Sequence, residues 1–91
     1  MNAPTRNLVK APDLYQPISC IFYDYLEADA TLGKVSTIKY VDHNGVVETI
    51  TGIIKDLHAK QGEEFLLLDD GQVIRLDAIS EFNGMTASQA C

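Results

Sequence analysis

The histidines and cysteines of this chain are few and stand far apart, and its carboxylates form no recognisable catalytic or metal-binding motif. His43 lies in the segment DHNG, and His58 begins the polar segment HAKQGEE. Neither histidine has a second ligand type three or four residues away, which is the spacing of zinc sites. We therefore expect both histidines to be exposed loop residues, and the sequence predicts no metal site.

Three further candidates have simpler structural explanations. Cys20 could act as a nucleophile only beside a positioned base, and its sequence neighbours offer none. We expect it instead to pack as a small buried residue at a helix start. Asp69 and Asp70 stand before a glycine, where turn preference explains them. With no glycine-rich phosphate loop in the sequence, we predict neither an enzyme nor a cofactor.

Composition indicates one small domain. The chain has 91 residues, of which 46% are hydrophobic, enough for one core. It has no apolar run long enough to span a membrane, and its first ten residues lack the apolar region of a secretory signal. Its two cysteines, Cys20 and Cys91, are too few for a disulfide scaffold. We expect a cytoplasmic protein with reduced thiols and no membrane contact.

The charge balance bears on the kind of partner. Thirteen acidic residues against seven Lys and Arg give a formal net charge of −6. A domain that binds nucleic acid by neutralising phosphates normally has a basic face, so direct nucleic-acid binding is disfavoured. A basic partner is favoured, although net negative charge can also serve solubility alone. Charge does not decide between these two explanations.

Turn and cap signals divide the chain into one helix followed by strands. Residues 1–14 are expected to form a flexible arm, and residues 84–91 a disordered tail. Ser19 can cap a helix over residues 20–31, which Gly33 ends. Alternating or continuous apolar runs predict five strands, and residues 58–64 are expected to form a loop. The expected strands are 34–41, 46–57, 65–69, 72–76 and 77–82.

The order of these elements predicts the fold. The chain is expected to be mainly β with one N-terminal α-helix, a bent five-stranded antiparallel barrel of the Sm-like type over residues 15–83. An OB barrel would instead place its helix between the third and fourth strands. Gly52 is the expected bend or bulge in the longest strand, and Asn44-Gly45 is the expected hairpin turn.

The helix has more apolar surface than one core contact requires. At about 100° per residue, Tyr23, Leu26 and Ala30 share one side, with Asp24 and Glu27 beside it. The opposite side is expected to hold Ile21, Phe22 and Tyr25. This second side needs a partner, a second copy of the chain, or the arm residues Leu8, Val9 and Leu14 to cover it.

Two separated motifs resemble one known family. Tyr15, Pro17 and Cys20 are followed by Tyr23, Asp24, Leu26 and Glu27, and the chain later has Arg75, Leu76, Asp77, Ile79 and Phe82. From Tyr15 to about Phe82 the sequence is similar to the Rof family, also called YaeO. These small acidic bacterial proteins have a helix on an Sm-like sheet and bind transcription termination factor Rho.

The resemblance implies a function and a set of contact residues. Family members are antiterminators that occupy the primary RNA-binding site on the N-terminal domains of hexameric Rho. By position, Asp24 and Glu27 are the expected contacts to basic residues of Rho, and Lys60 lies where the family has a possible second contact. The full set of expected partner-binding residues is Phe22, Tyr23, Asp24, Tyr25, Glu27 and Lys60.

The sequence also departs from the family and leaves alternatives open. Ile21 and Phe22 stand where a family member has acidic residues, so the apolar part of the contact should be larger here. A monomer that binds Rho and no nucleic acid is the main hypothesis. The alternatives are an Sm-like RNA-binding module and a structural module that associates with a copy of itself.

Overall fold

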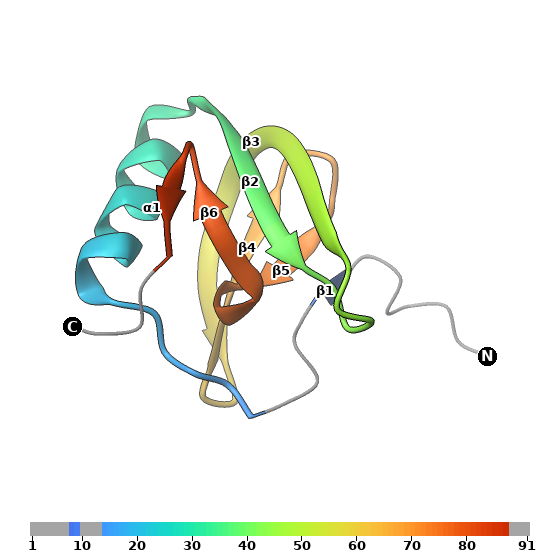
Figure 1. The fold of residues 1–91 in the computed structure, drawn as a ribbon. Coiled ribbons are helices and arrows are strands. Elements are labelled where there is room, and N and C mark those ends of the chain that lie inside the picture. The colour runs from blue at the N-terminus through green and yellow to red at the C-terminus, as the bar shows by residue number, and fades with distance from the viewer. Residues whose placement is uncertain (1–7, 10–13, 88–91) are drawn as a thin grey trace.

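A computed structural model, which describes residues 8–9 and 14–87, shows a mainly β protein with one helix (Figure 1). The helix α1 spans Cys20–Leu32 and packs against one side of a twisted sheet. A short 3-10 helix, Leu76–Ala78, joins β5 to β6. The strands are β1 (Leu8–Val9), β2 (Val35–Val41), β3 (Val47–Lys60), β4 (Glu63–Leu68), β5 (Val73–Arg75), β6 (Ile79–Phe82) and β7 (Met85–Thr86).

The sheet is open, which corrects the predicted barrel. Its strand order is β1-β5-β4-β3-β2-β6-β7, and β1 and β7 lie at opposite ends without pairing. All neighbours are antiparallel except β1 and β5, which are parallel. The five predicted strands are present as β2 to β6. Two short strands extend the sheet at its two edges, so the sequence underestimated the strand number.

The long strand β3 connects the two halves of the sheet, and the prediction that its bulge lies at Gly52 is wrong. Residues 47–53 pair with β2, and residues 54–60 pair with β4. The irregularity lies between Ile54 and Asp56, whereas Gly52 faces Ser36 in regular register. Glycine is favoured at position 52 for another reason, because a Cβ atom there would lie 3.0 Å from Asp69 Oδ1. That oxygen accepts a hydrogen bond from the Ile53 N–H.

The predicted loop at residues 58–64 is wrong, because β3 and β4 continue through it as a hairpin. Only Gln61 and Gly62 form the turn, with φ angles of 55° and 82°. Positive φ at both central residues gives the turn a twist that matches the flanking strands. The residues of this segment are polar because the end of the hairpin is exposed. Composition alone does not distinguish such a hairpin end from a loop.

The expected terminal segments contribute strands as well. Met85 and Thr86 pair with Phe82 and Glu81, so this part of the predicted disordered tail belongs to the sheet. Leu8 and Val9, within the predicted flexible arm, pair with Val73 and Ile74 of β5. Residues 1–7, 10–13 and 88–91 lie outside the described residues.

The helix begins and ends where the cap signals predicted. The Ser19 Oγ accepts a hydrogen bond from the Phe22 N–H at 3.0 Å, and Gly33 ends the helix in the left-handed region with φ 66°. Phe22 and Leu26 are buried between the helix and the sheet. The Phe22 ring meets the Phe82 ring edge to face at 6.3 Å, which joins α1 to β6.

A buried ion network holds the segment that leads into the helix. The Arg75 guanidinium donates to both carboxylate oxygens of Asp77, at 2.6 and 2.7 Å, and lies 5.4 Å from the centroid of the Tyr15 ring. The Tyr15 hydroxyl donates to Glu64 Oε1 at 2.7 Å, and Asp77 also accepts from the Gln16 N–H. Residues 15 and 16 are thereby fixed to β4 and the 3-10 helix, which sets the start of α1.

Candidate partner-binding surface

Three sides of α1 have different neighbours, and the buried side includes one residue predicted to face outward. Phe22 is only 2% exposed, as part of the core that also contains Leu26. Around the helix axis, Phe22 is about 40° from Leu26, and the angle between Phe22 and Tyr25 is larger. The prediction that Phe22 contacts a partner is therefore wrong, because a core residue is not available to one.

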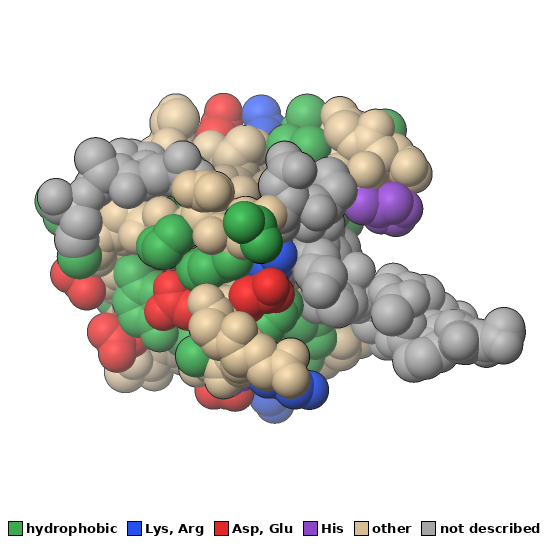
Figure 2. All heavy atoms as spheres, turned by 90° about the horizontal axis from the view of Figure 1, so that it is seen from below, with side chains coloured by type: hydrophobic (Ala, Val, Ile, Leu, Met, Phe, Trp, Pro, Cys, Tyr) green, Lys and Arg blue, Asp and Glu red, His purple; other side chains and the backbone are tan. Residues whose placement is uncertain are grey.

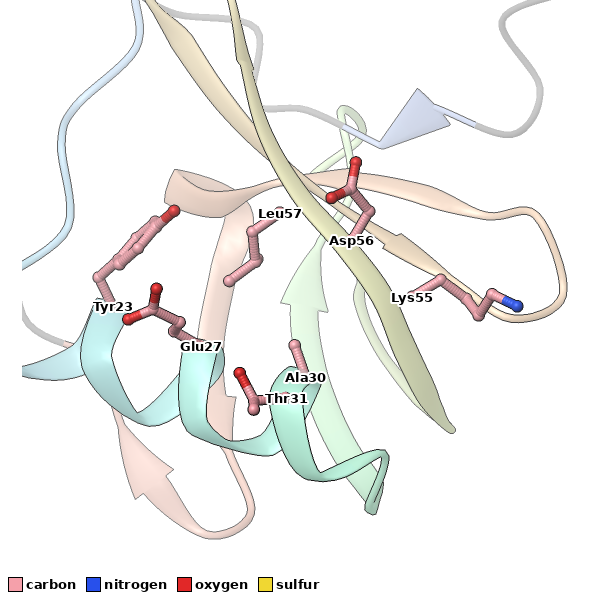
Figure 3. Close-up of a pocket in the computed structure, with 7 residues that line it drawn as sticks. All are labelled: Tyr23, Glu27, Ala30, Thr31, Lys55, Asp56 and Leu57. Atoms are coloured by element: carbon pink, nitrogen blue, oxygen red, sulfur yellow. The ribbon is translucent and has the colours of Figure 1, made fainter.

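The side of α1 that faces β3 forms a hollow of about 270 Å³. Tyr23 and Glu27 of the helix extend next to each other toward β3, and Leu57 extends from β3 toward the helix (Figure 3). Asp56 and Lys55 form the strand side of the rim, and Lys55 extends away from the helix. The hollow therefore has an aromatic ring, an apolar floor and two carboxylates at its margin.

A second hollow of about 250 Å³ lies nearer the start of the helix. Ile18, Cys20, Tyr23, Asp24 and Glu64 line it. Tyr23 lines both hollows, so the two meet at this ring. We use the name acidic groove for the combined surface of Tyr23, Asp24, Glu27, Asp56 and Glu64.

The electrostatics of the groove are visible at Tyr23. Burial raises the pKa of its hydroxyl, and the negative charges of Glu64, Glu27 and Asp56 raise it further. Three carboxylates from α1, β3 and β4 thus act on one phenol. A negative charge at this position is disfavoured and a positive one is favoured. Acidic side chains, in red, lie among hydrophobic ones, in green, on the face of the molecule that Figure 2 shows from below.

The structure brings together only part of the predicted contact set. Tyr23, Asp24 and Glu27 share the acidic groove, as their helical spacing predicted. Tyr25 is 51% exposed and points from another side of the helix. Lys60 ends β3 beside the Gln61–Gly62 turn and lines neither hollow.

Sequence reasoning missed the strand side of the groove. Asp56 and Leu57 come from the predicted strand at residues 46–57, and Glu64 comes from the predicted loop at residues 58–64; none of them was a predicted contact. Ile54, Leu57 and Phe65 do not follow a period of two, so no local signal marked these residues. His58 was predicted to be an exposed loop residue, but it is half-buried in β3.

His58 has two neighbours that explain its position. Its ring stacks on that of Phe65 at 5.5 Å, and its Nδ1 lies 3.6 Å from Asp56 Oδ2. His43 is exposed in the turn between β2 and β3, as predicted. Asp70 accepts a hydrogen bond from the Gln72 N–H and so stabilises the turn, as its position before glycine indicated. Asp69 instead accepts from the Ile53 N–H of β3.

Cys20 differs from the expectation in its chemical state. It is disulfide-bonded in the structure, whereas the sequence predicted a reduced and buried thiol. The residue is exposed at the first position of α1 and lines the second hollow. Cys91 lies outside the described residues.

Within residues 8–9 and 14–87, no group of three or more His, Cys, Asp or Glu side chains is placed to hold a metal ion. The same part of the chain has no helix of the length and apolarity that crossing a membrane requires. Comparison of the chain with protein-family models, with curated proteins and with solved structures gave no match. The resemblance to the Rof family therefore rests on the motif residues alone.

Proposed function

We propose that this protein binds transcription termination factor Rho and blocks the loading of RNA at its primary RNA-binding site. The observation that carries the proposal is the acidic groove, in which the negative charges of Glu27, Asp56 and Glu64 act on the hydroxyl of Tyr23. The family resemblance supplies the identity of the partner. Inhibition of Rho-dependent termination would follow, with a monomeric, cytoplasmic protein acting on Rho and binding no nucleic acid itself.

The groove has the chemistry that such competition requires. A site that binds RNA presents Arg and Lys side chains to phosphates and flat surfaces to bases. Carboxylates such as Asp24 and Glu27 can pair with those cations in charge-assisted hydrogen bonds. The Tyr23 ring can take a stacked position or receive a cation on its face. This binding would be fast and would weaken as salt rises.

The finer description of the fold is part of the same proposal. We propose that the sheet is an open variant of the Sm-like fold. Its helix precedes all five of the longer strands, and β3 is shared between two halves of a bent sheet. An open sheet with short strands at both edges agrees with a monomer, because β1 and β7 leave little edge for another copy to extend.

The test is displacement of a fluorescently labelled cytidine-rich RNA from purified Rho, followed by anisotropy at two salt concentrations. The wild-type protein should displace the RNA, and less effectively at the higher salt. Asp24→Lys and Glu27→Lys should each weaken displacement strongly. Glu48→Lys is the matched control, because Glu48 is an exposed acid of β3 that lines neither hollow.

Equal displacement by all four proteins would refute the proposed contact. Failure of the folded wild-type protein to displace RNA from active Rho would refute the function. Direct binding of the RNA by this protein would instead favour the alternative of an RNA-binding module.

Disulfides are rare in the cytoplasm, so the titration should be carried out with both reduced and oxidised protein. We expect the reduced protein to be active.

A further inference from the structure

An apolar stripe runs along the side of α1 that faces away from the sheet. It consists of Ile21, Tyr25, Ala28 and Leu32, spaced four, three and four residues apart, which places them on one side of a helix. Ile21 is 68% exposed, Tyr25 51% and Leu32 67%, and Ala28 is also exposed. At 1.5 Å per residue the stripe is about 17 Å long.

Within residues 8–9 and 14–87, the core contacts of the fold do not use this stripe. The core contact of α1 is made by Phe22 and Leu26, on another side of the helix. The arm residues expected to cover the stripe lie elsewhere, since Leu8 and Val9 pair with β5 and Leu14 is 85% exposed. Three large apolar side chains in one row exceed what scattered surface residues explain.

The charges around the stripe indicate what covers it. Helix α1 has three acidic residues and no Lys, Arg or His. Asp24 and Glu27 follow the stripe on one side, toward the acidic groove. Asp29 lies on the other side, where its carboxylate accepts hydrogen bonds from Ser36 and Asn83.

These charges disfavour a second copy of the chain as the occupant. Pairing α1 with α1 through the stripe would bring acid against acid with no base on either helix to compensate, and such like-charge contacts are unfavourable. An apolar surface bordered by Lys and Arg is complementary to both the stripe and the acids beside it. The stripe therefore fits a basic partner better than it fits itself.

We infer that the stripe is the apolar half of the interface whose acidic half is the groove, and that it binds an apolar patch flanked by basic side chains on the same partner. This inference rests on the proposed function. The two halves should respond differently to salt. Ions screen the charge pairs of the groove, whereas burial of Ile21 and Leu32 is insensitive to screening.

The test uses the Rho displacement titration over a series of salt concentrations. Ile21→Ser combined with Leu32→Ser should weaken displacement by about tenfold or more, the usual effect of losing well-buried interface side chains. The dependence of its affinity on salt should match that of the wild type. Asp24→Asn combined with Glu27→Gln should weaken displacement and also make it less dependent on salt. Val47→Ser is the matched control, because Val47 is 59% exposed on β3 and lies outside both surfaces.

The outcomes separate this inference from the proposed function. Wild-type affinity in the folded stripe variant, with loss in the acid variant, would overturn the inference and leave the function standing. Absence of displacement by the wild type would refute the function and the inference with it. Sedimentation that shows a wild-type dimer and a monomeric stripe variant would assign the stripe to a second copy and also overturn the inference. Circular dichroism of each variant establishes that α1 is intact.

Discussion

Asp77 offers the sharpest test of how the helix is held in place. Its side chain is 3% exposed and that of Arg75 is 2% exposed, so the two charges are almost completely removed from water. Asp77→Ala removes the two hydrogen bonds to the guanidinium and the acceptor of the Gln16 N–H. Arg75 then retains Glu63, whose Oε1 lies 3.5 Å from Nη1 and whose side chain is 30% exposed.

The size of the effect follows from which charge is left uncompensated. Breaking a buried ion pair by removing one partner costs about 3–5 kcal/mol. The remaining contact to Glu63 places Asp77→Ala near the lower end, at about 3 kcal/mol. A small domain is stable by only about 5–15 kcal/mol, so this loss is a large fraction of the total. Arg75→Met combined with Asp77→Leu removes both charges and should cost much less than Asp77→Ala.

Urea unfolding followed by circular dichroism measures both variants. The midpoint should fall strongly for Asp77→Ala, with the slope against urea unchanged. A loss below about 1 kcal/mol for this variant would refute the reasoning, because it would mean that the pair is effectively solvated. Equal losses for the single and the double variant would refute it as well, since packing and not charge would then dominate.

Three further predictions concern the helix ends and the network. Ser19→Ala should lower the free energy of unfolding by about 1 kcal/mol through loss of the bond to the Phe22 N–H, as urea unfolding would show. Gly33→Ala should cost about 1–2 kcal/mol because Gly33 has φ 66°, whereas Gly33→Asn should cost less, and equal costs would contradict this explanation. Burial and the hydrogen bond to Glu64 raise the pKa of Tyr15 above its ordinary 10.0. The unfolded chain therefore releases this proton at lower pH than the folded chain does. The free energy of unfolding should be unaffected below pH 10 and should fall as the pH rises above 10. Thermal unfolding over that range should show a less steep fall for Tyr15→Phe than for the wild type.

Local signals predicted the helix and the strand pattern well. Ser19 and Gly33 act at the two ends of α1 as their types indicate, because caps depend on neighbours within one turn. The alternation in residues 34–41 predicted β2, in which Ser36, Ile38 and Tyr40 point inward. Asp24, Glu27 and Tyr23 also lie together as predicted, since their proximity follows from helical spacing alone.

Long-range contacts were the part that local patterns did not reveal. The pairing of β1 with β5 depends on residues more than sixty positions apart, and nothing within the arm indicates it. Asp56 and Glu64 enter the acidic groove only because the β3–β4 hairpin lies beside the helix. The side of the helix predicted for Phe22 was wrong for a local reason. Its helical position lies between the exposed side and the buried side, and its contact with the Phe82 ring places it on the buried side.

The structure also separates two roles among the motif residues that resemble the Rof family. Tyr15, Arg75 and Asp77, distant in sequence, meet in one buried network that fixes the segment before α1. Such residues are required by the position of the helix whatever it contacts. A resemblance at these three positions therefore supports the placement of α1 on the sheet and is neutral about the partner. The functional proposal depends instead on Asp24 and Glu27, which are exposed and have no such structural requirement. Their substitution, with the network left intact, is accordingly the comparison that separates a shared fold from a shared partner.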